Sequence, residues 1–376
     1  MNFRPASPRL RRLLPLAVAV AAGAGAGAGA YALTSNGAST PTTSSVVVPA
    51  QPASSTSSVD SLTQLYNQDA PGVVDITVTS TSKSGSGGTN PFQLPGPSQQ
   101  KQEAEGTGFE IDSSGNILTA EHVVDGASSI EVEFQDGSTA KATLVGADKS
   151  TDTAVIHVDK SASELHPLAL GSSTAVQPGQ SVVAIGSPFG LPETMTAGIV
   201  SATNRTITAP NRFSITDAIQ TDAAINHGNS GGPLIDVATN TVIGINDQIE
   251  SDTNDNAGVG FAVPIDAAKK VARTLIAGGT VQHAYLGVTI TSAAGGARIT
   301  CVVNGGPAAS AGLKQGDVIT RFAGTTIDDA DTLTAAVTQA RPGSKATVTL
   351  RHRGSTKQVS VTLGSQPSSL ANNCTP

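Results

Sequence analysis

The segment from Gly228 to Leu234, Gly-Asn-Ser-Gly-Gly-Pro-Leu, constrains the fold of this chain more than any other stretch. Its glycines tolerate positive φ angles and carry no side chain, so the backbone can turn tightly and expose the hydroxyl of Ser230. The same turn lets backbone N–H groups converge beside that hydroxyl, as in an oxyanion hole. We therefore predict that Ser230 is a nucleophile and that the N–H groups of Gly228, Asn229 and Ser230 are oxyanion donors.

Two upstream residues complete a catalytic triad with Ser230. His122 lies in the run Leu-Thr-Ala-Glu-His-Val-Val, and Asp152 lies in Thr-Asp-Thr-Ala-Val-Ile. The order His, Asp, Ser along the chain is one of the known convergent triad orders. In this chemistry Ser230 attacks a carbonyl, His122 takes and returns the proton, and Asp152 orients the imidazole. Asp148 is a nearby alternative acid, but it occupies a turn before the strand.

Composition narrows the remaining possibilities. With 376 residues the chain has room for two domains and a tail. Aromatic residues make up only 3% and tryptophan is absent, so the cores must be aliphatic. A net charge of −7, with no Lys/Arg cluster beyond the N-terminus, argues against nucleic acid as a partner. The two cysteines are far apart and lack ligand spacing, so we expect no metal or redox chemistry. Triad chemistry itself requires no metal and no organic cofactor.

The N-terminal part of the sequence predicts export. Residues 1–12 are basic, and residues 13–33 form an uncharged run that is either a signal peptide or a transmembrane anchor. Ala-Tyr-Ala at 30–32 offers a cleavage site, whereas the Ser/Thr/Pro-rich segment 34–58, expected to be a disordered linker, suits a tether. In either case the rest of the chain is extracytoplasmic, because the positive end stays in the cytoplasm.

Short apolar runs between Gly and Pro turns predict an all-β barrel or sandwich over residues 59–279. Within this region the polar stretch from Ser80 to Glu105 is expected to be a long surface loop. A helix follows Pro264, and the pair Gly278-Gly279 ends it and marks a domain boundary.

The residues after this boundary predict a small α+β domain over 284–364, followed by a tail over 365–376. Its clearest helix runs from Asp329 to Ala340 and is stopped by Pro342. Cys301 lies in this domain and Cys374 in the tail. An exported protein can form a disulfide between them, but two free thiols remain the alternative.

The chain resembles the HtrA/DegP family of trypsin-like serine proteases with a C-terminal PDZ domain, of the actinobacterial type with an N-terminal signal or anchor. The resemblance covers residues 59–363 and adds several motifs to the segment around Ser230. These are Gly-Thr-Gly-Phe at 106–109, Ile-Leu-Thr-Ala-Glu-His-Val-Val at 117–124, Asp-Lys-Ser-Thr-Asp-Thr-Ala-Val at 148–155, Ala-Ile-Gly-Ser-Pro-Phe-Gly-Leu at 184–191, Gly-Ile-Val-Ser at 198–201, Gln-Thr-Asp-Ala-Ala-Ile-Asn at 220–226 and Gly-Phe-Ala-Val-Pro at 260–264.

This resemblance implies a chymotrypsin-like double β-barrel in residues 59–279, with the triad in the cleft between the barrels, and it selects Asp152 as the triad acid. It also implies that Ala224 and Ile225 line the pocket for the residue before the scissile bond. Both are uncharged, so we expect cleavage after small aliphatic residues. Ile245 and Asn246 would lie on the strand that pairs with the substrate backbone.

The sequence departs from the family at His227, where a proline is usual. Proline fixes φ near −65°, so His227 would leave the oxyanion loop softer at the rim of the substrate pocket. A solvent-facing substitution without effect is the alternative interpretation.

By the same resemblance, the C-terminal domain is a PDZ domain whose carboxylate-binding loop and first groove strand contain Tyr285, Leu286, Gly287 and Val288. Consecutive N–H groups around the glycine can bind the C-terminus of a peptide, and the strand after it can pair with the peptide backbone. Leu333 and Val337 are either groove residues or ordinary core residues.

Together these features predict an ATP-independent serine endopeptidase that cleaves misfolded or unfolded extracytoplasmic proteins and is regulated or targeted by its PDZ domain. The resemblance further implies a homotrimer. The alternative is a PDZ-bearing chaperone or scaffold with little proteolysis. An esterase of the α/β-hydrolase type is disfavoured by the triad order.

Overall fold

The computed structural model describes residues 57–83, 99–187, 194–211, 213–226, 228–247, 258–367 and 374–375. Expectations for the basic segment 1–12, for the signal or anchor 13–33, for nearly all of the linker 34–58 and for His227 lie outside these residues. Within the described ranges, no helix combines the length and the apolar character needed to cross a bilayer.

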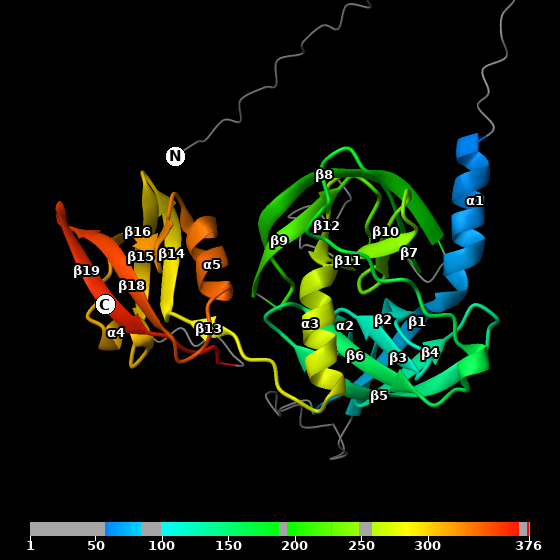
Figure 1. The fold of residues 1–376 in the computed structure, drawn as a ribbon. Coiled ribbons are helices and arrows are strands. Elements are labelled where there is room, and N and C mark those ends of the chain that lie inside the picture. Colours follow the sequence, from blue (N-terminus) through cyan, green and yellow to red (C-terminus); the bar gives the residue numbers. More distant parts are fainter. Residues whose placement is uncertain are drawn as a thin grey trace, which may run out of the picture. The chain divides into compact units, whose positions relative to one another are not determined.

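Six antiparallel strands close the first barrel in the order β1-β2-β3-β6-β5-β4 (Figure 1). Alternating residues produce the inner face: in β4, Ile130 and Val132 are buried while their neighbours are exposed. Helix α1 and the 3₁₀ turn η1 precede the barrel, α2 follows β3, and η2 follows β6. The bounds are α1 Ser57–Asp69, η1 Ala70–Gly72, β1 Val73–Lys83, β2 Gln99–Glu110, β3 Asn116–Thr119, α2 Glu121–Val124, β4 Ser129–Glu133, β5 Thr139–Asp148, β6 Thr153–Val158 and η2 Ala162–Glu164.

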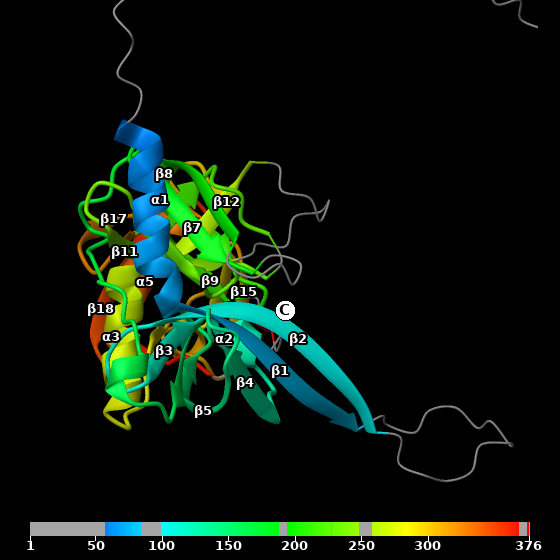
Figure 2. The ribbon, with the colours of Figure 1, turned by 90° about the vertical axis from the view of Figure 1, so that its right-hand side faces the viewer.

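The hairpin of β1 and β2 corrects the two ends of the loop expected from Ser80 to Glu105, since residues 80–83 and 99–105 are strand; residues 84–98 lie outside the described residues. The two strands pair continuously out to Lys83 and Gln99 and extend beyond the barrel (Figure 2). Their outer halves are rich in Ser, Thr and Gln, a composition that we took to indicate a loop. Cross-strand pairing over this length supplies the backbone hydrogen bonds that the local sequence pattern does not predict.

Six further strands close the second barrel in the order β10-β11-β12-β9-β8-β7. Strand β11 pairs with β10 on one side and with β12 on the other. The amphipathic helix α3 follows β12, as predicted from Pro264 and Gly278. The bounds are β7 Ser181–Gly186, β8 Thr194–Thr208, β9 Ser214–Thr221, β10 Pro233–Asp236, β11 Thr241–Asp247, β12 Gly260–Pro264 and α3 Ile265–Ile276.

One hydrophobic cluster joins the two barrels. It includes Phe109 and Val155 from the first barrel, Ile185 and Ile245 from the second, and Leu275 from α3, all buried. Because side chains of both barrels pack in one close-packed cluster, the barrels and the loops between their strands keep fixed relative positions. The structure therefore confirms the predicted double β-barrel.

The C-terminal domain contains a sheet in the order β14-β15-β16-β18-β19, with β17 beside β16 and β21 beside β15, and a two-stranded pair of β13 and β20. Helix α5 agrees with the predicted helix, and its first turn is capped by the Asp329 side chain. The bounds are β13 Ala284–Tyr285, β14 Val288–Ala293, β15 Gly296–Val303, α4 Pro307–Ser310, β16 Val318–Phe322, β17 Thr325–Thr326, α5 Ala330–Thr338, β18 Lys345–His352, β19 Ser355–Thr362, β20 Gly364–Ser365 and β21 Cys374–Thr375.

Cys301 and Cys374 form a disulfide, with their Cα atoms 5.4 Å apart. Cys374 also pairs through its backbone with Val303 of β15. The structure thus favours the bridge over the two free thiols that the sequence left open.

Candidate active site

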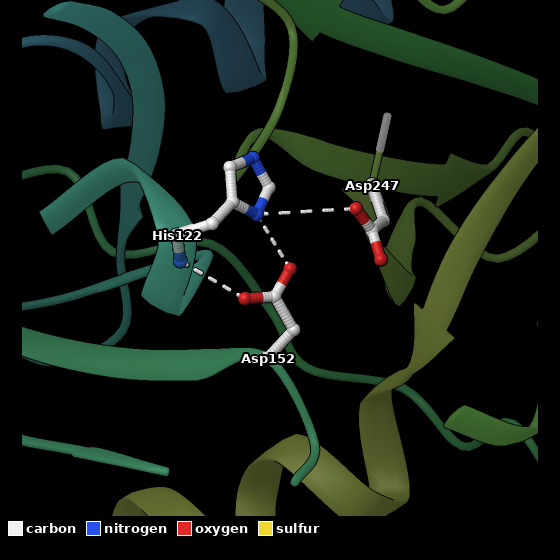
Figure 3. A group of neighbouring side chains, drawn as sticks. All are labelled: His122, Asp152 and Asp247. Atoms are coloured by element: carbon white, nitrogen blue, oxygen red, sulfur yellow. Dashed lines mark hydrogen bonds and ion pairs between the residues drawn. The ribbon is translucent and has the colours of Figure 1, made fainter. Parts of the chain in front are cut away.

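His122 and Asp152 form the centre of the site. His122 lies in the short helix α2, directly after β3, and Asp152 lies in the turn between β5 and β6. The Nδ1 atom of His122 is 2.6 Å from Oδ2 of Asp152, and the backbone N–H of His122 donates to Oδ1 of the same carboxylate at 2.9 Å (Figure 3). Both carboxylate oxygens therefore hold His122, which fixes the ring orientation and places the proton on Nδ1.

Asp152 is fully buried and has a positive φ of 46°. The left-handed backbone is unfavourable for most residues but tolerated by Asp, so this turn is shaped to present the carboxylate. Asp148, the alternative acid, faces other partners: it accepts from the hydroxyl of Thr151 at 2.6 Å and lies 2.9 Å from Nε2 of His283. The choice of Asp152 over Asp148 thus agrees with the geometry.

The loop that carries Ser230 is fixed against both barrels. The N–H of Thr107 donates to the carbonyl of Ser230 at 2.9 Å, and the N–H of Gly231 donates to the carbonyl of Asn246 at 2.8 Å. A Cβ atom on Gly231 would overlap the carbonyl oxygen of Thr107 and the hydroxyl of Thr119. Thr119 lies three positions before His122, and Asn246 lies near the end of β11. Gly231 therefore brings the Ser230 loop into contact with both the His122 segment and β11.

Hydrogen bonds within the loop of Ser230 reduce the three predicted oxyanion donors to two. The N–H of Asn229 donates to the carbonyl of Asn226 at 3.0 Å, so it is engaged in a turn. Gly228 has a φ of 99°, and its carbonyl accepts from the Thr107 hydroxyl at 2.5 Å. The N–H groups of Gly228 and Ser230 donate in none of the backbone bonds found outside helices and strands in the described part of the chain. They remain the two candidate donors.

The hydroxyl of Ser230 is buried and makes no hydrogen bond to any described residue. The two nitrogens of His122 point in different directions, and Nε2 faces away from the carboxylates (Figure 3). Catalytic hydrogen bonds are often long in structures without substrate and shorten when substrate binds. The missing bond is therefore consistent with a resting form of a triad.

Two further acids near His122 were not singled out from the sequence. Asp247, at the end of β11, places Oδ1 4.0 Å from Nδ1 of His122, and Glu121 is the adjacent residue in α2. Burial lowers the pKa of His122, but the hydrogen bond and charge of Asp152 and the charges of Asp247 and Glu121 outweigh it, so this pKa is raised. An acid at a strand end is commonly a turn residue, so sequence alone gave little signal for Asp247.

Among the described residues, His122, Asp152 and Asp247 are the one group of three or more side chains whose potential ligand atoms lie close enough to hold a metal ion. The separation of 2.6 Å between Nδ1 and Oδ2 is that of a charge-assisted hydrogen bond. We therefore interpret the group as a hydrogen-bonded catalytic centre and not as a metal site.

The predicted pocket residues fall into two groups. Ala224 is half-buried, and its carbonyl accepts from the hydroxyl of Thr196 and the side-chain amide of Asn229. Ile225 is buried in an aliphatic cluster of the second barrel and lies directly against Gly260. Both surroundings are uncharged, which fits the expected preference for aliphatic groups.

The expectation for Ile245 and Asn246 is not supported. Both residues are fully buried in β11, where Ile245 pairs with Pro233 on one side and Val263 on the other. The N–H of Asn246 donates to the carbonyl of Gly232. A substrate strand cannot pair with these residues without displacing their present partners, so they support the site and do not line it.

Tyr285, Leu286, Gly287, Val288, Leu333 and Val337 all line one cavity. Gly287 has a φ of 79°, which favours glycine at this turn, and Val288 begins the edge strand β14. Leu333 is 1% exposed and belongs to the core of the C-terminal domain, whereas Val337 is half-buried. Of the two helix residues, Leu333 is therefore mainly a core residue.

Comparison with known proteins agrees with this geometry. Residues 106–245 match the family model of the trypsin-like peptidase domain, and residues 284–363 match that of the PDZ domain. Fold and site therefore define a trypsin-like serine peptidase domain followed by a PDZ domain. The serine protease PepD of Mycobacterium tuberculosis is 42% identical over 287 residues, which cover 70% of this chain and 61% of PepD.

A probable periplasmic serine endoprotease of Halomonas elongata, described as DegP-like, is 42% identical over 72% of this chain and 58% of its own. The solved structure of the HtrA-type protease AlgW with a decapeptide matches with a TM-score of 0.66 and 33% identity, over 82% of this chain and 99% of that one. The chain belongs to the HtrA family of serine proteases. It spans less than two thirds of the length of these two curated relatives.

Proposed function

We propose that this chain is an ATP-independent serine endopeptidase. The observation that carries the proposal is the pair of the buried Asp152 and the half-buried His122, 2.6 Å apart beside the loop of Ser230. This arrangement presents a nucleophile, an oriented base and two backbone donors at one junction, which is the set of groups that acyl transfer needs.

In the first step the hydroxyl of Ser230 attacks the scissile carbonyl, and its proton passes to Nε2 of His122. The imidazolium keeps its Nδ1 proton on Asp152, and the oxyanion accepts from the N–H groups of Gly228 and Ser230. His122 then protonates the leaving amine, and an acyl-enzyme remains until water repeats the sequence of steps. Because His122 must be neutral to act as a base, its raised pKa predicts activity that increases as pH rises through that value.

Hydrolysis of casein by the full chain, compared with Ser230→Ala, tests the activity. We expect hydrolysis and covalent labelling by a fluorophosphonate in the wild type and neither in Ser230→Ala. Equal hydrolysis by both would assign the activity to a contaminant. Peptide binding without hydrolysis or labelling would instead favour the chaperone or scaffold.

We also propose cleavage after Val, Ala or Ile. The uncharged surroundings of Ala224 and Ile225 support this preference, because a buried Arg or Lys would lack a carboxylate to pair with. The acid nearest in sequence, Asp222, is engaged with the N–H of Ile199. Such aliphatic residues are buried in folded proteins, so unfolded chains would be preferred substrates. Faster cleavage after Arg than after Val in a peptide library would contradict the assignment.

For the PDZ domain we propose binding of peptide C-termini along β14. This strand pairs with β15 on one side and forms the end of its sheet, which leaves an edge for β-augmentation. We further propose an extracytoplasmic location, which is supported by the similarity to the probable periplasmic endoprotease of Halomonas elongata. Calorimetric titration with free and amidated peptides of the same sequence tests carboxylate recognition.

A further inference from the structure

Asp247 occupies a position that the triad mechanism does not use. It is the last residue of β11 and is 1% exposed. Its neighbour Asn246 binds the nucleophile loop through three hydrogen bonds: its carbonyl accepts from Gly231, its N–H donates to the carbonyl of Gly232, and its side-chain amide donates to that of Pro233. Asp247 is therefore held at a fixed place relative to Ser230.

The carboxylate of Asp247 lies on the same side of the imidazole as that of Asp152. Its Oδ1 is 4.0 Å from Nδ1 of His122, compared with 2.6 Å for Oδ2 of Asp152, and the two acids approach from different barrels (Figure 3). At 4.0 Å Asp247 is too far for a hydrogen bond but close enough for a strong charge interaction inside a protein.

The other charges around His122 do not change this arrangement. Glu121, from the same helix as His122, is the third acid that acts on the ring, and Lys149 lies 3.4 Å from Glu121 and 2.9 Å from Asp125. Lys149 thus partly neutralises Glu121. The charge that develops on His122 faces Asp152 and Asp247 most directly.

We propose that Asp247 is a second orienting carboxylate of His122, which stabilises the imidazolium together with Asp152 and helps to keep the proton on Nδ1. This inference rests on the proposed peptidase activity and adds a positioning residue to it. When Ser230 gives its proton to Nε2, the ring gains one positive charge while the Nδ1–H bond stays intact. That charge is then shared between two buried carboxylates from two barrels.

The first test measures His122 directly and does not depend on turnover. In the full chain, with Ser230→Ala to prevent self-cleavage, NMR of ¹³Cε1-labelled histidine follows the six histidines, and loss of one signal in His122→Gln assigns the ring. We expect Asp247→Asn and Asp247→Ser to lower the pKa of His122. An unchanged or higher value in both folded variants would overturn the proposal.

Asp317→Asn is a matched control, because Asp317 is also a buried acid and lies 2.5 Å from Nδ1 of another histidine, His352. It removes a similar pair in the C-terminal domain. We expect no change at His122 in this variant. A shift of the same size would mean that the effect of Asp247→Asn is a general charge effect and would overturn the proposal.

The second test is a double-mutant cycle on kcat/KM at high pH, where His122 is neutral. Asp247→Asn alone is expected to lower kcat/KM on the order of tenfold and to move the acid limb of the profile to lower pH. In an Asp152→Asn background the same change should cost on the order of a hundredfold, because Asp247 is then the remaining carboxylate at Nδ1.

If Asp247→Asn lowers kcat/KM equally in the wild type and in the Asp152→Asn variant, and the acid limb of the pH profile does not shift, Asp247 has only a structural role and the proposal is wrong. The proposed function is tested separately by the wild type. If the wild type shows no hydrolysis that depends on Ser230, the peptidase activity fails, while the NMR comparison still decides whether Asp247 acts on His122.

Discussion

Glu110 is a fully buried acid at the end of β2, and it is the clearest single-residue source of pH-dependent stability. Burial raises its pKa to about 7, although the N–H of His166 donates to its carboxylate and Lys160 lies nearby. The folded state therefore binds the proton more tightly than the unfolded state. Below the unfolded pKa the buried Glu110 carries no ionisation cost; the cost grows as pH rises from that value to about 7 and is constant above it.

Glu110→Gln should consequently stabilise the protein relative to wild type at pH 8, by up to roughly 3 kcal/mol, and this advantage should vanish near pH 4.5. Urea unfolding at several pH values measures the difference. Glu164→Gln is the contrasting control. The carboxylate of Glu164 accepts from the backbone N–H and the hydroxyl of Ser161, which lowers its pKa. Glu164→Gln should therefore destabilise the protein at high pH, whereas Glu110→Gln stabilises it. A constant advantage of Glu110→Gln at all pH values would contradict the prediction.

At the scale of single residues, the sequence predicted the roles of residues that lie within short, recognisable motifs. The pairing of His122 with Asp152 followed from short motifs around each residue, and the structure brings them to 2.6 Å. Asp247 and Glu110 were not predicted, because their roles depend on neighbours distant in sequence. Asn246 was assigned to the substrate strand, but its backbone is used to hold the nucleophile loop.

At the scale of elements, periodic apolar patterns with clear end signals were predicted well, as α3 and α5 illustrate. The outer half of the β1–β2 hairpin was not predicted, because its sequence has no alternating apolar pattern and the strands form by pairing with each other. Helix α1 was not predicted as a helix. Its start at Ser57 lies two residues before Val59, where the sequence predicts that structure begins, directly after the Ser/Thr/Pro-rich segment.

The N-terminus of α5 gives a prediction at this scale. Oδ1 of Asp329 accepts from the N–H of Thr332 at 2.8 Å and from its hydroxyl at 2.6 Å, which lowers the pKa of Asp329. Asp329→Ala should cost about 1 kcal/mol of stability at neutral pH, whereas Asp329→Asn should retain most of it. Because the pKa is lowered on folding, this contribution is lost as pH falls through the folded value.

Urea unfolding of the full chain, followed by a probe in the C-terminal domain, measures the effect. Asp331→Ala is the control, since Asp331 lies in the same first turn but is exposed, and it contributes through the helix dipole with only a few tenths of a kcal/mol. Equal losses from the two substitutions would assign the stabilisation to charge and not to the cap.

At the scale of the whole molecule, the barrels and the C-terminal domain are stabilised by different means. The barrels share a hydrophobic cluster that includes residues from both sheets and α3. The C-terminal domain has a separate core and holds the chain's two cysteines in one disulfide between β15 and β21. A reducing agent should therefore affect the C-terminal domain and leave the barrels unchanged.

The bridge closes a loop of 73 residues. The loss of chain entropy in the unfolded state predicts that a disulfide across such a loop stabilises the fold by about 4 kcal/mol. Measured stabilisation is often smaller, so this is an upper value. We expect dithiothreitol to lower the unfolding temperature of the C-terminal domain in the wild type but not in the double variant Cys301→Ser/Cys374→Ser. Hydrolysis of a short peptide, which needs only the barrels, should persist in both. Thiol titration of the denatured, unreduced wild type should detect no reactive groups, and detection of two would disprove the bridge.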